Sequence, residues 1–407
     1  MAVNKNDYDI GIVGAGISGL TLAVTILEKN PSASILLLER SGRVGGRILN
    51  TESINVENTE PIKSVDLGGA WIWPSSMPFT MKYIKRYNIP LVQQEGSDGT
   101  QMRVKGGITL LVQNLLKEIN CDNIGKFKET KSDIETKPGR NRRVNLMLNS
   151  MLVRVEESKS ENKVCLYVQN MHDETLSTTS SENNSPFTVK HLVITAPPAK
   201  LAEEIKFDGS ETRYITKDLK AKMKQQPIWM ASVGKLALSY KEKFWKADDI
   251  MISLRPSDYT NSKSHGNHFS GAFQVYDAGV NGEGEHTVVA FVTCGRREQA
   301  TYTAEIMAEI VSKQLDESEI ERTNSTSFSK YESRHLKCWR TDKNINKVDD
   351  DESYPVYPNA ILGLNDDTIE GRRIWFGGSE ASENWTGMIE GAVMNGNMIG
   401  EKIANFQ

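Results

Sequence analysis

The feature that most constrains the fold is a glycine-rich turn between two short apolar segments near the N-terminus. The first apolar segment covers residues 8–13, and residues 18–29 then carry apolar side chains at helical spacing. The second apolar segment, residues 34–38, ends in Glu39. This order predicts a strand, a helix and a second strand, the βαβ unit that begins a doubly wound α/β sheet.

The turn has the spacing GxGxxG and comprises Gly14, Ala15, Gly16, Ile17, Ser18 and Gly19. Glycine at these positions lets the backbone approach a pyrophosphate, and the positive N-terminus of the following helix attracts that anion. Glu39 lies twenty residues after Gly19, where a carboxylate accepts hydrogen bonds from ribose hydroxyls. We interpret the segment as a dinucleotide-binding site, with a purely structural turn as the alternative.

Composition narrows the class of protein. A chain of 407 residues is long enough for two or three domains, and its formal net charge of −4 argues against a dedicated nucleic-acid-binding surface. The sequence has no run of about 18 apolar residues, and residues 1–9 are too polar for a signal peptide. We therefore expect a cytoplasmic protein with no membrane or nucleic-acid partner.

The cysteines favour neither a metal centre nor a disulfide scaffold. They are too widely spaced for a CxxC site and too few for a scaffold in a chain of this length. The four positions are Cys121, Cys165, Cys294 and Cys338. We expect no metal site, and a reducing compartment.

Other segments show the periodicity of helices or strands. Helical patterns occur at residues 80–87, 107–120, 303–315 and 387–404. Strand patterns occur at residues 143–156, 163–169, 189–195, 232–240, 272–276, 287–293 and 373–376. Residues 172–186 are rich in Ser, Thr, Asn and Glu, which predicts a solvated loop.

Glycines are concentrated towards both ends of the chain. After the first turn come Gly42, Gly45, Gly46, Gly68 and Gly69, and the C-terminal part contains Gly371, Gly377, Gly378, Gly387, Gly391, Gly396 and Gly400. Because a strand and a helix are also predicted in this last part, we expect it to complete the first domain.

Three of these segments resemble motifs of the flavin-containing amine oxidase family, which includes monoamine oxidases, polyamine oxidases and L-amino-acid oxidases. They are SGRVGGR at residues 41–47, DLGGAW at residues 66–71 and GGSEASENWTGMIEGA at residues 377–392. The family shares a glycine doublet flanked by arginine, an LGG-aromatic segment beside the flavin ring, and a C-terminal GTE…WSGxxEGA run. The resemblance spans the chain and implies FAD as the cofactor.

The resemblance also implies which residues bind FAD. The glycine turn would hold the pyrophosphate, Glu39 the ribose, Leu152 the adenine through its backbone, and Glu380 the ribityl chain. Further contacts are implied for Arg40, Gly46, Arg47, Gly68, Gly69, Ala70, Trp71, Gly378, Ser379, Gly387, Met388 and Ile389. A helix that begins near Gly387 would stabilise reduced flavin, which is anionic at N1, by a few tenths to about 2 kcal/mol.

A lysine in the strand pattern 232–240 is the main catalytic candidate. With the period of two residues in a strand, Lys235 shares a face with Val233, Ala237 and Ser239. Taken alone, a lysine is usually a solvated surface residue. The resemblance instead implies that Lys235 binds a water beside flavin N5.

Two departures from the family pattern concern the covalent flavin bond and the substrate amine. Monoamine oxidases bond the flavin to a cysteine, and the matching place here reads Glu352-Ser353-Tyr354; we therefore predict noncovalent FAD. Those enzymes also flank the amine with two tyrosines. Tyr354 matches one of them, Met388 stands at the place of the other, and Trp339 matches a tryptophan found near the flavin.

A third departure concerns the substrate domain. Only residues 74–105 are available for a long helical insertion of the family, so the substrate domain is predicted to be shortened, with a more open active site or one closed by another subunit. We expect a discontinuous Rossmann-like FAD-binding domain of the α/β class, residues 1–73, 106–198 and 341–407. The remaining residues, 74–105 and 199–340, would form a smaller α+β substrate domain.

The function that these features favour is oxidation of a primary or secondary amine to an imine, with hydride transfer to flavin N5 and reduction of O2 to H2O2. One alternative is a flavoprotein oxidase or desaturase of another small molecule, such as an amino acid, a reduced nicotinamide or a pigment precursor. Another is a catalytically weak, FAD-bound partner subunit. Either a homo-oligomer or association with a partner subunit is compatible with the sequence.

Overall fold

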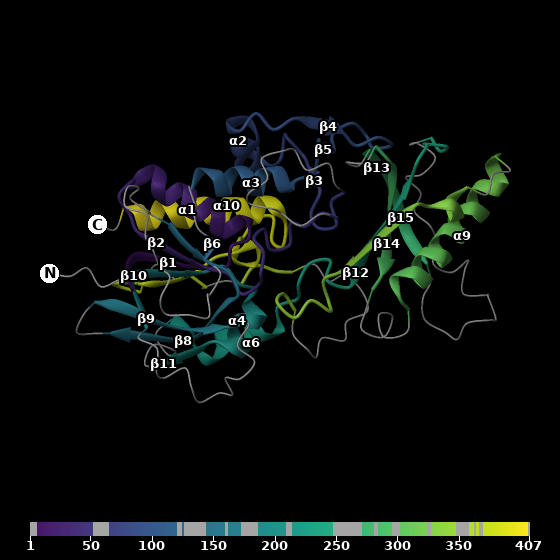
Figure 1. The fold of residues 1–407 in the computed structure, drawn as a ribbon. Helices are drawn as coiled ribbons and strands as arrows, with labels where there is room; N and C mark the ends of the chain where they lie inside the picture. The colour runs from purple at the N-terminus through teal and green to yellow at the C-terminus, as the bar shows by residue number, and fades with distance from the viewer. Residues whose placement is uncertain are drawn as a thin grey trace. The chain divides into compact units, whose positions relative to one another are not determined.

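The computed structural model describes residues 6–51, 65–119, 124–125, 144–158, 162–171, 186–208, 214–246, 271–280, 284–294, 302–323, 327–346, 358–361, 364–365 and 369–405. The chain packs into two compact units (Figure 1). Unit 1 comprises residues 1–46, 112–227 and 358–407, and unit 2 comprises residues 47–111 and 228–357. The bounds of these compact units differ from those of the expected FAD-binding and substrate domains. The bounds of the functional domains stay a prediction.

Unit 1 begins with the predicted βαβ unit. It consists of β1 (Asp7–Val13), α1 (Ile17–Lys29) and β2 (Ile35–Leu38), and β1 pairs with β2 in parallel. All four residues of β2 are buried, as expected for a strand covered on both faces of a parallel sheet. The α/β fold predicted from the sequence is confirmed.

The parallel part of the sheet joins segments from three stretches of the chain. Its order is β16-β10-β1-β2-β7-β6, with β10 (Phe187–Ile194) bonded to both β1 and β16 (Ile374–Phe376). On the other side, β2 pairs with β7 (Val144–Met147), which pairs with β6 (Ile124–Gly125). The C-terminal segment therefore completes this sheet, as predicted.

An antiparallel extension follows in the same sheet. It contains β8 (Ser150–Ser158) and β9 (Lys163–Asn170), with β11 (Lys206–Asp208) parallel to β8. The prediction of a single strand at residues 143–156 is wrong, because the chain turns at Asn149, whose φ is +53°. This turn lets β7 stay in the parallel ladder while β8 begins a hairpin.

Two helices complete this part of unit 1. They are α4 (Pro198–Glu204) and α6 (Lys217–Gln225), which is capped by Thr216 through a 3.1 Å bond from the Leu219 N–H. Leu201, Leu219 and Met223 of these helices are buried in the same core as residues of β8, β9 and β10. Of the loop predicted at residues 172–186, all but the last residue lies outside the described residues.

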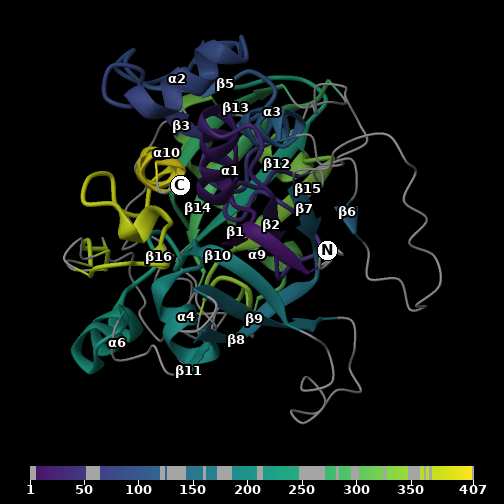
Figure 2. The same cartoon turned by 90° about the vertical axis from the view of Figure 1, so that its left-hand side faces the viewer.

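The two ends of the chain meet in unit 1 through α10 (Ile389–Ala404), which packs along α1 in both views (Figures 1 and 2). Gly396 and Gly400 lie one turn apart on the face of α10 that meets α1, and the side-chain nitrogen of Asn397 donates to Thr25 Oγ1 at 2.9 Å. A Cβ at Gly396 would lie 2.4 Å from the backbone oxygen of Ser18. The glycines at the two ends thus allow these helices to approach closely.

Unit 2 contains a four-stranded antiparallel sheet in the order β13-β14-β12-β15. The strands are β12 (Val233–Tyr240), β13 (Ala272–Val280), β14 (His286–Thr293) and β15 (Ser333–Cys338). Leu236 and Leu238 of β12 pack with residues of α9 (Ala304–Thr323) and Phe328 of the short helix η3 (Phe328–Lys330), whereas Val233 and Ala237 pack on the opposite face. Both faces of β12 are therefore buried.

The rest of unit 2 is a small layer built from residues 65–111. A sheet of order β3-β5-β4 is formed by β3 (Trp71–Ile72), β5 (Met102–Val104) and β4 (Leu91–Gln93). The helix α2 (Pro78–Arg86) lies between β3 and β4, and α3 (Thr109–Glu118) begins after β5, which confirms the helices predicted near these positions. Within the part of the chain that the structure describes, no helix is both long enough and apolar enough to cross a bilayer.

The contact between α1 and α10 makes a testable prediction. Gly396→Ala should lower the free energy of unfolding by about 1–3 kcal/mol, because the added methyl group would overlap the backbone of α1 and force the helices apart. Met398→Ala in the same helix is the control, since Met398 is 49% exposed and its truncation should change stability by less than about 0.5 kcal/mol. Urea unfolding measures both, and equal stability of the two variants would contradict the packing described.

Candidate functional site

Several of the residues predicted to bind a dinucleotide lie at one edge of the unit 1 sheet. Gly14 follows β1, Glu39 follows β2, and Gly377 follows β16, so all three come directly after parallel strands. The Gly14 N–H donates to Leu38 O at 2.8 Å, and the Gly377 N–H donates to Ile194 O at 2.7 Å. The carboxyl ends of parallel strands are where ligands bind in doubly wound sheets.

The glycine turn is held by contacts that exclude side chains. Gly14 has a φ of +104°, and a Cβ there would lie 2.5 Å from Thr195 Oγ1. A Cβ at Gly46 would lie 3.2 Å from the Cα of Gly16, and the Gly45 N–H donates to Ala15 O at 2.8 Å. The second glycine segment, Gly45 and Gly46, therefore lies directly against the glycine turn of residues 14–19.

The carboxylate of Glu39 organises this edge. One oxygen accepts from the Ala15 N–H at 2.9 Å, and the other accepts from the N–H and the hydroxyl of Ser41, both at 2.8 Å. Since a carboxylate has about four lone-pair sites, it can accept further bonds from ribose hydroxyls. Glu39 is thus fixed in orientation by its own turn.

The N-terminus of α1 fits an anion. Its N-cap residue is Gly16, which has no side chain to bond the first N–H groups, and the first turn contains no acidic residue. The Leu20 N–H is bonded to Gly16 O at 3.0 Å, whereas the N–H groups of Ile17, Ser18 and Gly19 have no acceptor within the helix. Together with the helix dipole, these donors match a pyrophosphate.

Two arginines near this turn have partners within unit 1. Arg40 donates to the carboxylate of Glu204 in α4, which also accepts from Lys200 at 2.6 Å. Arg43 donates to Gly46 O at 2.7 Å and so holds the second glycine segment. The contact of Arg40 with FAD stays a prediction, and Arg43 was not among the residues that the resemblance singled out.

The C-terminal motif approaches α1 within unit 1. Gly378 has a φ of +98°, and its N–H donates to Ser18 Oγ at 3.3 Å. The short helix η4 (Ser379–Ala381) follows, in which Ser379 Oγ donates to Glu380 at 2.9 Å. Glu380 is buried, and its role towards the ribityl chain stays a prediction.

The helix predicted to begin near Gly387 begins at Ile389 and has an acidic residue in its first turn. The N-cap residue is Met388, without a side-chain cap, and Ile389 is the first helical residue. The preceding Gly387 has a φ of +78°, and its N–H donates to Ser379 O at 3.2 Å. Glu390 lies buried in the first turn, where its carboxylate offsets part of the positive helix terminus that the sequence analysis assigned to reduced flavin.

The structure does not test the predicted roles of Leu152 and Tyr354. Leu152 lies in β8 opposite Val168, and its side chain belongs to the core of unit 1. Tyr354 lies outside the described residues. Their predicted roles therefore stay predictions.

Lys235 lies in the middle of β12 in unit 2, and its side chain is 9% exposed. Its ammonium donates to Gly68 O at 2.6 Å and to Asp66 O at 3.3 Å. It projects on the face that packs Val233 and Ala237, as the strand period predicts. The lysine is therefore buried against the backbone of the DLGGAW segment and is not a solvated surface residue.

Aromatic rings surround this ammonium. Its nitrogen lies 5.7 Å from the ring centre of Tyr276 and 5.6 Å from that of Phe291. Trp71 contacts both rings, at 5.1 and 5.6 Å between ring centres, and its indole N–H donates to Gln94 at 3.2 Å. These rings stabilise a cation and exclude water from it.

Trp339 lies at the end of β15, next to the sheet neighbour of Lys235. Lys337 pairs with Lys235 in the ladder, and its ammonium lies 4.4 Å from the Trp339 ring centre. Asp342 accepts from this ammonium at 2.5 Å. One face of Trp339 is thus covered by a paired lysine, and its proximity to flavin stays a prediction.

Burial shifts the protonation of Lys235 and Asp66 towards their neutral forms. Desolvation lowers the pKa of Lys235 to about 8, although the Asp66 charge opposes this shift. Desolvation likewise raises the pKa of Asp66 to about 7, against the opposing charge of Lys235 and a backbone bond from Ile108. Arg103 acts on both groups: it favours the ionised form of Asp66 and disfavours the charged form of Lys235.

Several residues around Lys235 were not predicted from the sequence, namely Asp66, Gln94, Arg103, Tyr276 and Phe291. Asp66 carried a usable signal, since it is a charged residue between apolar residues directly before a glycine pair. The others lie in segments with ordinary periodicity. Among the residues that the structure describes, no group of three or more His, Cys, Asp or Glu side chains is arranged to hold a metal ion.

The model of the family described as flavin containing amine oxidoreductase matches residues 96–399, which is most of the chain. A model described as NAD(P)-binding Rossmann-like domain matches residues 12–87. The second match agrees with the βαβ unit and the anion site at α1.

Curated relatives match over a limited segment. An amine oxidase [flavin-containing] of Danio rerio is 35% identical over 106 residues, which is 26% of this chain and 18% of that protein. The (S)-6-hydroxynicotine oxidase of Paenarthrobacter nicotinovorans is 36% identical over 106 residues, 26% of this chain and 23% of that protein. The matched segment thus spans less than a quarter of each relative.

Similarity of fold extends much further. The solved structure of cyclohexylamine oxidase from Brevibacterium oxydans IH-35A has a TM-score of 0.65 with this chain and 14% sequence identity, and the match covers 98% of this chain and 99% of that one. The Rossmann-like turn and the flavin family identify FAD as the cofactor, which the dinucleotide edge of unit 1 fits. On the strength of the family match over residues 96–399, the chain belongs to the flavin containing amine oxidoreductase family.

Proposed function

We propose that the protein oxidises an amine to an imine with FAD as the electron acceptor and O2 as the final oxidant. The substrate loses a hydride from the carbon that bears nitrogen and a proton from the nitrogen, and O2 takes up the two electrons and two protons to give H2O2. Bound FAD supplies the two-electron redox step. The observation that carries the proposal is the buried ammonium of Lys235, held by the backbone of the DLGGAW segment.

Unit 1 has the groups needed to bind the nucleotide part of FAD. The free N–H groups at the start of α1 hold the pyrophosphate, and Glu39 accepts bonds from the ribose hydroxyls. Arg43 and Glu39 fix the two glycine segments through bonds to Gly46 O and the Ala15 N–H. In this proposal unit 1 supplies binding and orientation.

Lys235 of unit 2 supplies charge and a proton. A buried ammonium stabilises negative charge that develops during oxygen reduction, and it orients a water for imine hydrolysis. Because burial lowers the pKa of Lys235, the group releases its proton more readily than an exposed lysine. Trp71, Tyr276 and Phe291 keep bulk water away from it.

The residues that match the amine-flanking positions of monoamine oxidases do not identify which amine is the substrate. Tyr354 is assigned to one side of the substrate nitrogen and Met388 to the other, so the pair of tyrosines found in monoamine oxidases is not reproduced. We propose noncovalent FAD, since Glu352, Ser353 and Tyr354 stand where a cysteine would bond the flavin. Precipitation of the protein with acid should release all of the flavin into the supernatant, and flavin that stays with the pellet would contradict this.

The decisive experiment is anaerobic flavin bleaching. The FAD-loaded protein is mixed without oxygen with a panel of primary, secondary and polyamine substrates, and absorbance near the flavin maximum is followed. Loss of the oxidised flavin spectrum with an amine, followed by H2O2 release when air is admitted, is the expected result. Bleaching by NADH or an amino acid alone would favour another oxidase activity, and bleaching by no compound of a broad panel would favour a partner subunit without efficient catalysis.

Replacement of Lys235 tests its role. Lys235→Met should retain FAD but lower the rate of turnover by about 100-fold, because the buried charge that stabilises oxygen reduction is lost. Lys241→Met is the matched control, since Lys241 directly follows β12 but its side chain is 76% exposed and paired with Glu332. Stopped-flow measurement of flavin reduction and reoxidation separates the two half-reactions. Unchanged rates in both half-reactions would remove Lys235 from the mechanism.

Replacement of Glu39 tests the nucleotide site. Glu39→Ala should raise the Kd for FAD by about 10- to 100-fold, because a charged acceptor that also bonds the Ala15 and Ser41 N–H groups is removed. Glu203→Ala, at an exposed position of α4, should leave the Kd unchanged. Titration of the flavin-free protein with FAD, followed by flavin fluorescence, measures both values. An unaltered Kd in the Glu39 variant would show that this carboxylate does not bind the cofactor.

A further inference from the structure

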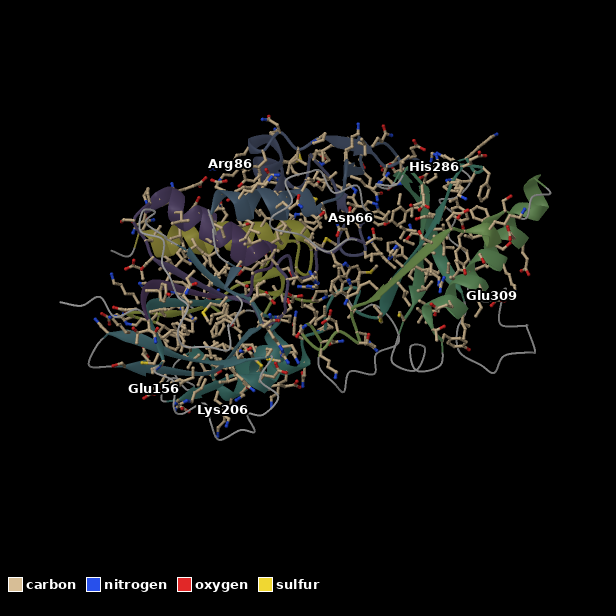
Figure 3. All side chains as sticks on the ribbon, in the orientation of Figure 1. Asp66, Arg86, Glu156, Lys206, His286 and Glu309 are labelled. Carbon is tan, nitrogen blue, oxygen red and sulfur yellow. The ribbon has the colours of Figure 1, made fainter. Side chains whose placement is uncertain are left out.

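We infer that Asp66 is a positioning residue for Lys235: it fixes the backbone that holds the ammonium and supplies the negative charge that keeps this ammonium protonated. The expected effect of Asp66 on turnover rests on the proposed function. Its effect on the position and protonation of Lys235 does not. Asp66 is labelled in Figure 3 among the side chains of unit 2.

Asp66 anchors its own segment. Both carboxylate oxygens accept from the Ile108 N–H, at 3.1 and 3.2 Å, directly before α3 begins. On the other side, the N–H groups of Leu67 and Gly68 donate to Leu49 O at 2.8 and 3.0 Å. Residues 66–68 are therefore held between two other segments of unit 2.

This anchored backbone holds Lys235. The ammonium donates to the carbonyl oxygens of Gly68 and Asp66, at 2.6 and 3.3 Å, so two of its three protons depend on where residues 66–68 lie. The backbone has little freedom to shift, since even a Cβ at Gly68 would lie 1.9 Å from Arg47 O. Loss of the Asp66 anchor would remove one of the contacts that keep both acceptors in this position.

Several neighbouring elements present titratable or charged groups to Lys235. Asp66 lies on the segment before β3, Arg103 on β5, Tyr276 on β13, and Lys337 on β15, where Asp342 accepts from its ammonium. Arg103 donates to Ala278 O at 2.5 Å and repels the Lys235 charge. Among the described groups acting on Lys235, Asp66 is the anion that opposes both this repulsion and desolvation.

The sign of each charge gives opposite expectations for two substitutions. Asp66→Asn keeps a side-chain oxygen for the Ile108 N–H but removes the negative charge, so the pKa of Lys235 should fall, by about one pH unit or more. Arg103→Gln removes a repelling positive charge, so the pKa of Lys235 should rise. Asp316→Asn is the matched control, since Asp316 is also buried and accepts two backbone N–H groups, from Phe328 at 2.7 Å and Ser329 at 3.1 Å.

The experiment measures the titration of Lys235 directly, in the FAD-loaded protein. Lysine is labelled with ¹³C at Cε, the Lys235 signal is assigned by its loss in Lys235→Met, and its chemical shift is followed against pH. A lower midpoint in Asp66→Asn, a higher one in Arg103→Gln and no change in Asp316→Asn are expected. An unchanged Lys235 midpoint in folded Asp66→Asn would overturn the inference.

A measurement on the unaltered protein covers the case in which Asp66→Asn does not fold. Because the two groups interact, protonation of Asp66 should add a second, more acidic inflection to the Lys235 titration curve. A single inflection would overturn the inference without any variant.

The pH profile of kcat/KM then separates this inference from the proposed function. Its basic limb should move to lower pH in Asp66→Asn and to higher pH in Arg103→Gln, in parallel with the Lys235 titration. If the titration moves and the pH profile does not, Asp66 controls Lys235 but Lys235 has no part in turnover, so the proposed role of Lys235 alone fails.

Discussion

Close approach of neighbouring groups to glycine backbone is the constraint on which unit 1 depends. An added Cβ would lie 2.5 Å from the Thr195 hydroxyl at Gly14, 3.2 Å from the Cα of Gly16 at Gly46, and 2.4 Å from the backbone oxygen of Ser18 at Gly396. These contacts set the shape of the first turn and the position of α10 beside it. Three of these residues, Gly14, Gly16 and Gly46, are also among those proposed to bind the dinucleotide, so a change in this packing would also change the proposed binding site.

Unit 2 depends on a different interaction, the burial of charge. Taking an ammonium and a carboxylate out of water is unfavourable, and it is offset here by carbonyl acceptors, by the Ile108 N–H and by the attraction between the two groups. Replacing such groups with apolar residues is often neutral or even stabilising. Stability alone therefore does not account for the burial of Lys235 and Asp66, which is consistent with the role proposed for Lys235.

The parts of the fold that follow from local pattern were predictable from the sequence. The βαβ unit, the strand of Lys235 and the face on which Lys235 lies all follow from periodicity within a short window. The break between β7 and β8 was not foreseen, because Asn149 adopts a positive φ without the glycine or proline that usually signals a turn. The salt bridge of Arg40 with Glu204, and the bonds of Lys235 to residues 66–68, join positions far apart in the sequence, and no local pattern encodes such pairings.

The internal bonds of the nucleotide site bear on how the cofactor enters. Glu39 accepts from the Ala15 N–H and the Gly45 N–H donates to Ala15 O, so these bonds join separate segments of the chain. Arg43 donates to Gly46 O within its own segment. The loops therefore lose little conformational entropy when FAD arrives, so more of the interaction energy remains as affinity. With the flavin noncovalent, as proposed, a rigid site of this kind favours tight retention of FAD and exchange by slow dissociation, without refolding of the loops.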